Sequence, residues 1–139
     1  MTKTALVTGG TRGIGAAIGR ALMAQGVTVI AAYHRDHERA KAFEQETGAR
    51  VQILEVTDFD ACMALSNELQ ADGTAIDILV NNAGIVADAM AHKMAPEQWH
   101  RVVDTNLNAC FNLCRAFLPG MRMRQWGRVV NISSINGLK

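Results

Sequence analysis

Short β-rich runs alternate along the whole chain with segments of helical periodicity, and this alternation limits the possible folds more than any other feature. The predicted strands are residues 4–8, 28–33, 50–55, 76–81 and 128–133. Between them, apolar residues recur every three or four positions, which is typical of helices that bury one face. Strands that alternate with helices predict an α/β fold with a parallel sheet covered on both faces. Because crossovers between parallel strands are right-handed, the sheet is expected to be doubly wound.

Start and stop signals bound the predicted helices. The helices run from Ile14 to Gly26, from His37 to Thr47, from Asp58 to Gly73 and from Pro96 toward Pro119. Asp58 is a good N-cap, and Pro96 suits the first turn of a helix. Glycine just after a helix commonly ends it. A chain of 139 residues organised in this way is expected to form one domain, residues 1–139, with a single core.

Composition excludes several classes of function. The net charge is +1, and the basic residues are scattered, so the chain shows no footprint for nucleic acid or for an acidic membrane surface. No apolar run is long enough for a transmembrane helix or for a signal peptide, which predicts a cytoplasmic protein. The cysteines Cys62, Cys110 and Cys114 lack metal-ligand partners at suitable spacing and are predicted to be buried, reduced thiols. No metal site is expected.

The stretch TGGTRGIG, residues 8–15, lies between the first predicted strand and the first predicted helix. Glycines in this position allow a sharp turn and a close approach of the backbone to a pyrophosphate, and the helix N-terminus offers unpaired N–H groups. A glycine cluster alone is more often only a turn. Its place at the start of a strand–helix–strand unit favours a dinucleotide site.

Four motifs in order resemble those of the short-chain dehydrogenase/reductase family. The glycines are spaced Gly9-x-x-x-Gly13-x-Gly15, which differs from the usual dinucleotide fingerprint and is similar to that of the family. The other three motifs are Asn81-Asn82-Ala83-Gly84 after the fourth strand, Thr105-Asn106-Leu107 in the long helix, and Asn131-Ile132-Ser133-Ser134 in the last strand. Each motif alone could be a turn, a polar helix position or a loop cap. Together they cover the whole chain and imply a Rossmann-like dinucleotide-binding domain.

The resemblance implies hydride transfer between a nicotinamide and a carbonyl or alcohol carbon, with a tyrosine as the proton donor. Ser134 would hold the substrate oxygen, and the backbone of Asn106 would order a water that reaches a lysine. The cofactor would contact Gly9, Thr11, Arg12, Gly13, Ile14, Gly15, Tyr33, Arg35, Glu55, Val56, Asn82, Ala83 and Gly84.

The end of the second strand favours NADP over NAD. A carboxylate there would bind the adenosine ribose 2′-hydroxyl and repel a 2′-phosphate. Relatives that use NAD carry Asp at the position of Tyr33, whereas Arg12 and Arg35 can supply charge-assisted bonds to a phosphate. Two features are less favourable: Asp36 could pair with Arg35, and Glu55 stands where many relatives have the Asp or Asn that contacts adenine.

In the family a Tyr-x-x-x-Lys pair follows the serine and supplies the acid. The given sequence has one tyrosine, Tyr33, with His37 in place of a lysine four residues later. The chain is therefore expected to be the N-terminal part of a longer enzyme, truncated after the fifth strand, and inactive by itself. A nucleotide-binding module without catalysis is the alternative from another class.

The stretches around residues 83–94 and 125–137 look most like family members that reduce acetoacetyl-CoA to 3-hydroxybutanoyl-CoA. Close cousins act on 3-oxoacyl groups carried by acyl carrier protein, and these commonly have a basic residue at the position of Gln125. An acyl thioester is the expected substrate, with CoA favoured as the carrier.

The long helix is apolar around much of its circumference, so a homo-oligomer, a dimer or tetramer, is expected.

Overall fold

The computed structural model of the chain describes residues 2–138. Its strands form one parallel sheet in the order β3-β2-β1-β4-β5. The strands are β1 (Thr4–Thr8), β2 (Thr28–Tyr33), β3 (Arg50–Ile53), β4 (Ile78–Asn81) and β5 (Arg128–Asn131). This order, with β1 in the centre and the connections running outward in both directions, confirms the predicted doubly wound, Rossmann-like α/β sheet.

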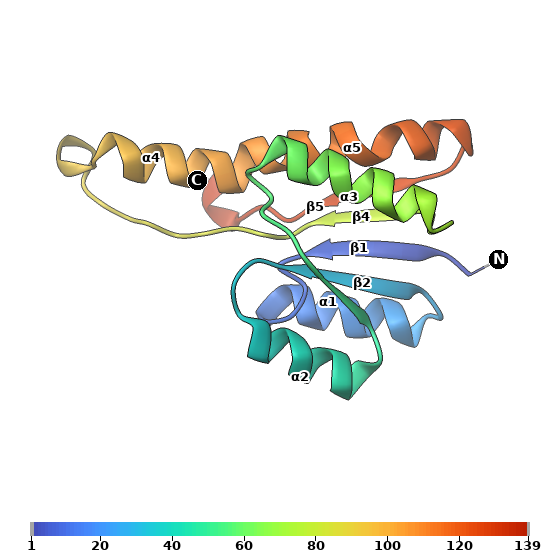
Figure 1. The fold of residues 1–139 in the computed structure, drawn as a ribbon. Helices are drawn as coiled ribbons and strands as arrows, with labels where there is room; N and C mark the ends of the chain where they lie inside the picture. The colour runs from blue at the N-terminus through green and yellow to red at the C-terminus, as the bar shows by residue number, and fades with distance from the viewer. Residues whose placement is uncertain (1, 139) are drawn as a thin grey trace.

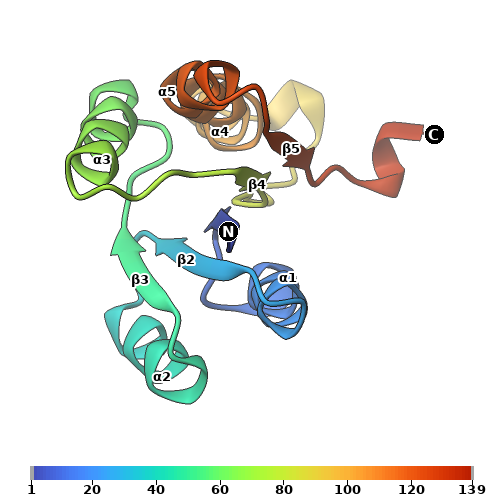
Figure 2. The ribbon, with the colours of Figure 1, turned by 90° about the vertical axis from the view of Figure 1, so that its right-hand side faces the viewer.

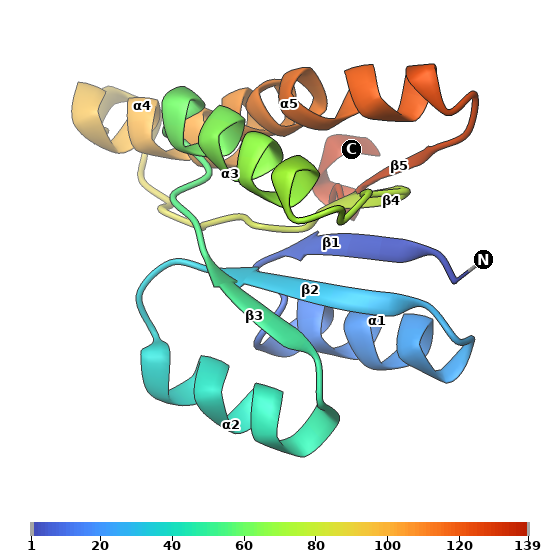
Figure 3. The same cartoon turned by 45° about the vertical axis from the view of Figure 1, so that its right-hand side comes forward.

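Helices cover the sheet in two layers (Figure 1). One layer contains α1 (Gly13–Ala24) and α2 (His37–Thr47), and the other contains α3 (Phe59–Ala71), α4 (Pro96–Val103) and α5 (Ala109–Met123). The end-on view separates the layers on either side of the sheet (Figure 2). The chain crosses from one layer to the other between β3 and α3 (Figure 3). Because the winding reverses about β1, the loops after β1 and β4 meet at the carboxyl edge of the sheet.

Two apolar clusters form the core, one on each face of the sheet. Leu6 and Leu79 face α3 and α5, where they pack with Leu113. Their strand neighbours Val7 and Val80 face α1 and α2. Residues that follow one another along β1 and β4 are therefore buried on opposite faces, which explains why these strands are continuous apolar runs in the sequence.

Local signals set boundaries of α2 and α3, and those at Gly48 and Asp58 are as predicted. The Asp58 carboxylate accepts a hydrogen bond from the Ala61 N–H at 2.9 Å and caps α3. Asp36 caps α2 in the same way, accepting from the Arg39 N–H at 3.0 Å. Gly48 ends α2 with φ of 73°, a left-handed conformation that glycine adopts without strain.

Three strands are shorter than predicted, because the chain turns toward the loops at the sheet edges. β3 ends at Ile53 rather than Glu55, and β5 ends at Asn131 rather than Ser133, while β4 begins at Ile78 rather than Ile76. Past Ile53, the Asp58 N–H bonds to the Glu55 carbonyl and closes a turn. Leu54 and Glu55, which follow β3, line the cleft described below.

The long helix predicted from Pro96 is divided into α4, the π-helical turn η2 (Asp104–Asn108) and α5. It also continues past Pro119 to Met123. Proline lacks the N–H that would bond to the carbonyl four residues earlier. The buried side chain of Met121 and the bond from the Arg124 N–H to the Gly120 carbonyl hold the last turn in place. No helix in residues 2–138 is long and apolar enough to cross a membrane.

The cysteines differ from one another in burial. Cys62 is fully buried, as predicted, whereas Cys110 and Cys114, one turn apart on α5, are only partly buried. Burial, together with the charges of Asp58 and Glu55, raises the pKa of Cys62 to about 11. Burial and the neighbouring Cys114 also raise the pKa of Cys110. Both thiols are therefore protonated at neutral pH and act as structural groups.

Candidate active site

The turn from β1 into α1 forms the floor of the site. Gly9 and Gly13 have φ of 60° and 52°, so glycine is needed for the chain to turn at these points. No side chain caps α1, whose N-cap residue is Arg12. The first N–H groups of a helix have no partner within the helix, and they carry a partial positive charge. The floor of the site can therefore hold an anion such as a pyrophosphate.

Gly15 packs directly against the glycine turn and the loop that follows β4. A Cβ atom at this position would overlap the Gly9 carbonyl oxygen and would stand 2.5 Å from Asn82 Nδ2. Above Gly13, in contrast, a Cβ would meet nothing within 4 Å. Gly15 thus brings the start of α1 against the neighbouring loop, while Gly13 leaves open space above the helix N-terminus.

A hydrogen-bond network joins the loops after β1 and β4. Thr8 Oγ1 accepts hydrogen bonds from the N–H groups of Asn82 and Ala83, at 3.0 and 2.9 Å. In return, Asn82 Nδ2 donates to the Thr8 carbonyl at 2.9 Å. This network fixes the Asn82–Gly84 loop beside the glycine turn, at the point where the winding of the sheet reverses and where ligands bind in such folds.

Two arginines line the cleft, Arg12 at the start of α1 and Arg35 after β2. Among residues 2–138, no carboxylate lies within 4.0 Å of Arg12 or Arg35 in an ion pair. Asp36 does not pair with Arg35; it caps α2 and faces Arg39 Nε at 3.5 Å. The hydroxyl of Tyr33 lies 3.0 Å from His37 Nδ1. The cleft is therefore lined by two guanidinium groups that have no carboxylate partner among residues 2–138.

Glu55 lies on the wall of the cleft and is held by two neighbours. Its Oε1 accepts bonds from the Thr57 N–H at 3.1 Å and the Thr57 hydroxyl at 2.8 Å, and its Oε2 lies 2.9 Å from His34 Nε2. Partial burial acts to raise the pKa of Glu55, but the bonds from Thr57 and the charges of His34 and Arg35 outweigh it and leave this pKa below its ordinary value. Glu55 is thus a carboxylate at neutral pH.

The cleft has a volume of about 910 Å³. It brings together most of the residues predicted to bind the cofactor, namely Gly9, Thr11, Arg12, Tyr33, Arg35, Glu55, Val56, Ala83 and Gly84. Gly13, Ile14, Gly15 and Asn82 do not line it. Gly13 and Ile14 stand at the exposed start of α1, whereas Gly15 and Asn82 lie in the contact between the two loops.

Asn106 lies in the π turn η2 and fastens the loop after β4 to the long helix. Its Oδ1 accepts from the Ile85 N–H at 2.8 Å, and its Nδ2 donates to the Ile85 carbonyl at 2.9 Å. Ile85 itself lines the cleft. π turns inside helices are frequent at functional sites. The side chain of Asn106 therefore positions the wall of the cleft, and the role predicted for its backbone stays a prediction.

Ser134 follows β5 at the carboxyl edge of the sheet and is exposed. Its Oγ accepts a hydrogen bond from the Asn136 N–H at 3.2 Å. The base of the segment is tied to β4, because Asn81 Nδ2 donates to Asn131 Oδ1 at 2.7 Å. Ser134 is not among the residues that line the cleft, and its catalytic role stays a prediction.

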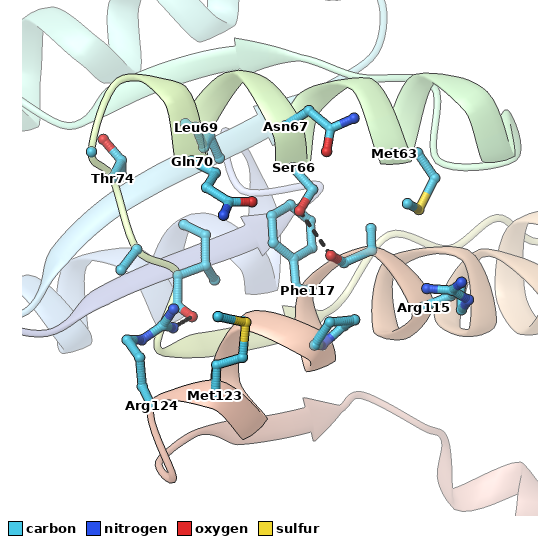
Figure 4. Close-up of a pocket in the computed structure, with 16 residues that line it drawn as sticks. Met63, Ser66, Asn67, Leu69, Gln70, Thr74, Arg115, Phe117, Met123 and Arg124 are labelled. Atoms are coloured by element: carbon cyan, nitrogen blue, oxygen red, sulfur yellow. Dashed lines mark hydrogen bonds between the residues drawn. The ribbon is translucent and has the colours of Figure 1, made fainter.

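A second hollow, of about 460 Å³, lies between α3 and α5 at the amino-terminal edge of the sheet (Figure 4). Two of the polar side chains in its lining, Ser66 and Arg124, have partners in the chain. Ser66 Oγ donates to the Ala116 carbonyl at 2.8 Å, and the Arg124 guanidinium donates to the Ile76 carbonyl at 2.6 Å. This hollow is a junction between helices, far from the glycine turn.

Within residues 2–138, no group of three or more His, Cys, Asp or Glu residues is placed to hold a metal ion.

The family model described as short chain dehydrogenase matches residues 3–139. The chain belongs to this family. It is 55% identical over its whole length to an acetoacetyl-CoA reductase of Rhizobium meliloti (strain 1021) and 52% identical to that of Paracoccus denitrificans. A 3-oxoacyl-[acyl-carrier-protein] reductase of Haemophilus influenzae is 39% identical over 97% of the chain. The chain spans only 56–58% of the length of these relatives.

Solved structures of the family share the fold. A metagenomic short-chain oxidoreductase in complex with NADP superimposes with a TM-score of 0.91 at 38% identity. The alignment covers 99% of this chain and 64% of the other. The predicted short-chain dehydrogenase resemblance is thus confirmed.

Several residues of this short-chain dehydrogenase site were not predicted from the sequence. Thr8 carries the network between the loops, His34 holds Glu55, and Thr57 orients the same carboxylate. Thr8 is the first residue of the TGGTRGIG stretch, so its place in that motif could have indicated a role in the site. His34 lies between two predicted residues, Tyr33 and Arg35, but its partner is distant in the sequence, so no local pattern could reveal the pair.

Proposed function

We propose that the chain forms the dinucleotide-binding part of an NADP-dependent reductase that converts acetoacetyl-CoA into 3-hydroxybutanoyl-CoA. The observation that carries this proposal is the agreement over all 139 residues with acetoacetyl-CoA reductases at 52–55% identity. The cleft supports it, because its glycine turn and its two arginines without ion-pair partners suit a phosphorylated dinucleotide.

The residues present fit such a cofactor. The open space above Gly13 and the free N–H groups of the first turn of α1 would receive the pyrophosphate. Arg12 and Arg35 would hold the 2′-phosphate through charge-assisted hydrogen bonds. Bound NADPH supplies a hydride. The Asn82–Gly84 loop, fixed by Thr8, would form the wall along the dinucleotide.

Ser134 is proposed to hold the carbonyl oxygen of the substrate by donating its hydroxyl hydrogen. Its exposure at the carboxyl edge of the sheet leaves the hydroxyl accessible to a substrate. Asn106 is proposed to keep the cleft in shape through its two bonds to Ile85. The proton that completes the alcohol requires a general acid, the family's tyrosine, and the given chain has no Tyr-x-x-x-Lys pair.

The cofactor assignment is tested by changing both arginines in the full-length protein. The Arg12→Ala/Arg35→Ala variant is expected to bind NADPH at least about 2 kcal/mol more weakly, while NADH binding stays nearly unchanged, because only NADPH carries the 2′-phosphate. Fluorescence titration with each cofactor measures this. Arg39→Ala is the matched control. Because Arg39 faces Asp36, its loss should not change the ratio of NADPH affinity to NADH affinity. Equal losses for NADPH and NADH in the double variant would refute the assignment.

CoA is favoured over acyl carrier protein as the carrier, and one structural observation supports this choice. The nearest basic residue to Gln125 is Arg124, whose guanidinium donates to the Ile76 carbonyl and lies 3.7 Å from Asp77 Oδ1. Its charge is thus engaged within the chain and is less available to an acidic carrier protein. The test compares the reduction rates of the same acyl group attached to CoA and attached to acyl carrier protein. The rate with CoA is expected to be the higher one.

We also propose that the full-length protein is a homodimer or a tetramer that uses the long helix. Leu107 and Phe111 are each 65% exposed on it, and Phe111 stacks on Phe59 at a centroid distance of 6.4 Å. Burying such side chains is worth roughly 1.5–3 kcal/mol each. A second copy of the helix would cover this face.

Light scattering on the full-length protein is expected to give the mass of a dimer or a tetramer. The Leu107→Glu/Phe111→Glu variant is expected to shift the mass downward, because two carboxylates would be buried without partners. A wild-type protein that remains a monomer at micromolar concentration would rule this assembly out.

A further inference from the structure

A histidine and a glutamate bridge the ends of β2 and β3 on the wall of the cleft. His34 Nε2 lies 2.9 Å from Glu55 Oε2, and both residues line the cleft together with Arg35. The other oxygen of Glu55 already accepts two bonds from Thr57. The Glu55 carboxylate is therefore held in a fixed place with its charge directed at His34.

Two carboxylates line the cleft near the ends of β2 and β3, Glu55 and Asp36. Glu55 has His34 as its basic partner. Asp36 is engaged by the N-terminus of α2 and by Arg39. His37 faces the hydroxyl of Tyr33. The remaining charged or titratable groups that line the cleft lie in α4 and η2, namely Glu97, His100, Arg101 and Asp104. Because the charge of Arg35 acts on Glu55, the partner of Glu55 affects how much positive charge Arg35 can offer to an anion.

We propose that His34 is a specificity-determining residue that acts through Glu55: by engaging this carboxylate, it leaves Arg35 available for the 2′-phosphate of the cofactor. The inference rests on the proposed NADP-dependent function. His34 is a positioning residue in this scheme and need not touch the cofactor. Both the charged imidazole and the neutral tautomer with its proton on Nε2 donate from this nitrogen to the carboxylate.

The consequence of losing His34 follows from the charges. The charge of Arg35 already acts on Glu55, and removing the histidine would leave Oε2 without its partner. The freed carboxylate would compete with a 2′-phosphate for Arg35 and would repel the phosphate. It would also become available to accept a bond from an unphosphorylated ribose hydroxyl. The loss should therefore fall on NADPH and not on NADH.

A double-mutant cycle in the full-length protein tests this inference. Dissociation constants for NADPH and NADH are measured for the wild type, His34→Ala, Glu55→Gln and the double variant. We expect His34→Ala to weaken NADPH binding about threefold to tenfold, the range for charges a few ångströms apart near water. NADH binding should stay the same or improve. With Glu55→Gln as the background, His34→Ala should change NADPH binding less than about twofold.

The controls separate this inference from the proposed function. His92→Ala removes a histidine of η1 (Ala91–Lys93), outside the cleft, and should alter neither constant. Equal weakening of NADPH and NADH by His34→Ala, or a loss that persists in the Glu55→Gln background, would overturn the role of His34 and leave the proposed cofactor intact. A wild type without preference for NADPH would overturn both.

Discussion

Gly15→Ala is expected to weaken NADPH binding at least about a hundredfold and to lower the free energy of unfolding by roughly 1–3 kcal/mol. The added methyl group would overlap the Gly9 carbonyl oxygen and would press on Asn82 Nδ2. Both neighbours are held in place, since Asn82 bonds to Thr8 and its Nδ2 also donates to the Gly9 carbonyl at 3.3 Å. The start of α1 must therefore move, which displaces the N–H groups that would receive the pyrophosphate. Cofactor titration and denaturant unfolding measure the two effects.

Gly19→Ala in the same helix is the matched control. A Cβ there would lie 3.5 Å from Phe43 Cζ and 3.6 Å from Val29 Cγ1, which are ordinary contacts. Since alanine favours the helix over glycine by up to about 1 kcal/mol, this variant should be as stable as the wild type or more so, with NADPH binding retained. Unchanged NADPH binding by Gly15→Ala would show that the glycine turn is not the cofactor site.

The second large effect concerns residues 1–139 in isolation, which are expected to reduce acetoacetyl-CoA at least about a hundredfold more slowly than the full-length protein. Their single tyrosine, Tyr33, ends β2, where its hydroxyl lies 3.0 Å from His37 Nδ1, and it is not followed by the lysine of a Tyr-x-x-x-Lys pair. The segment from β5 also leaves Val130 and Ile132 exposed, 44% and 39%. Exposed apolar edge strands promote association, so these residues alone should also tend to aggregate.

Most of the fold could be predicted from the sequence because its signals are local. Continuous apolar strands, helical periodicity and the caps at Asp58 and Gly48 each act within a few residues. The π turn at Asp104–Asn108 could not be predicted in this way. It belongs to a helix whose sequence pattern is continuous, and it coincides with the contact between Asn106 and Ile85, which lie 21 positions apart.

The candidate site was predicted in part for the same reason. The glycine turn and the two arginines are readable because their chemistry depends on residue type and on position after a strand. The availability of Arg35 is different, since the neighbouring Asp36 could have neutralised it. The structure shows that Asp36 caps α2, through a local contact with Arg39, and that His34 engages Glu55 across two strands. The second pairing depends on how β2 and β3 lie side by side, so no local pattern could reveal it.

The most direct test of the account is the steady-state oxidation of NADPH with acetoacetyl-CoA, measured for the full-length protein and for residues 1–139. The full-length protein is expected to turn over with NADPH and to do so more slowly with NADH. Residues 1–139 should show at least about a hundredfold less activity, because the general acid is absent. Comparable turnover by the two proteins, or no turnover of acetoacetyl-CoA by the full-length protein, would contradict the account.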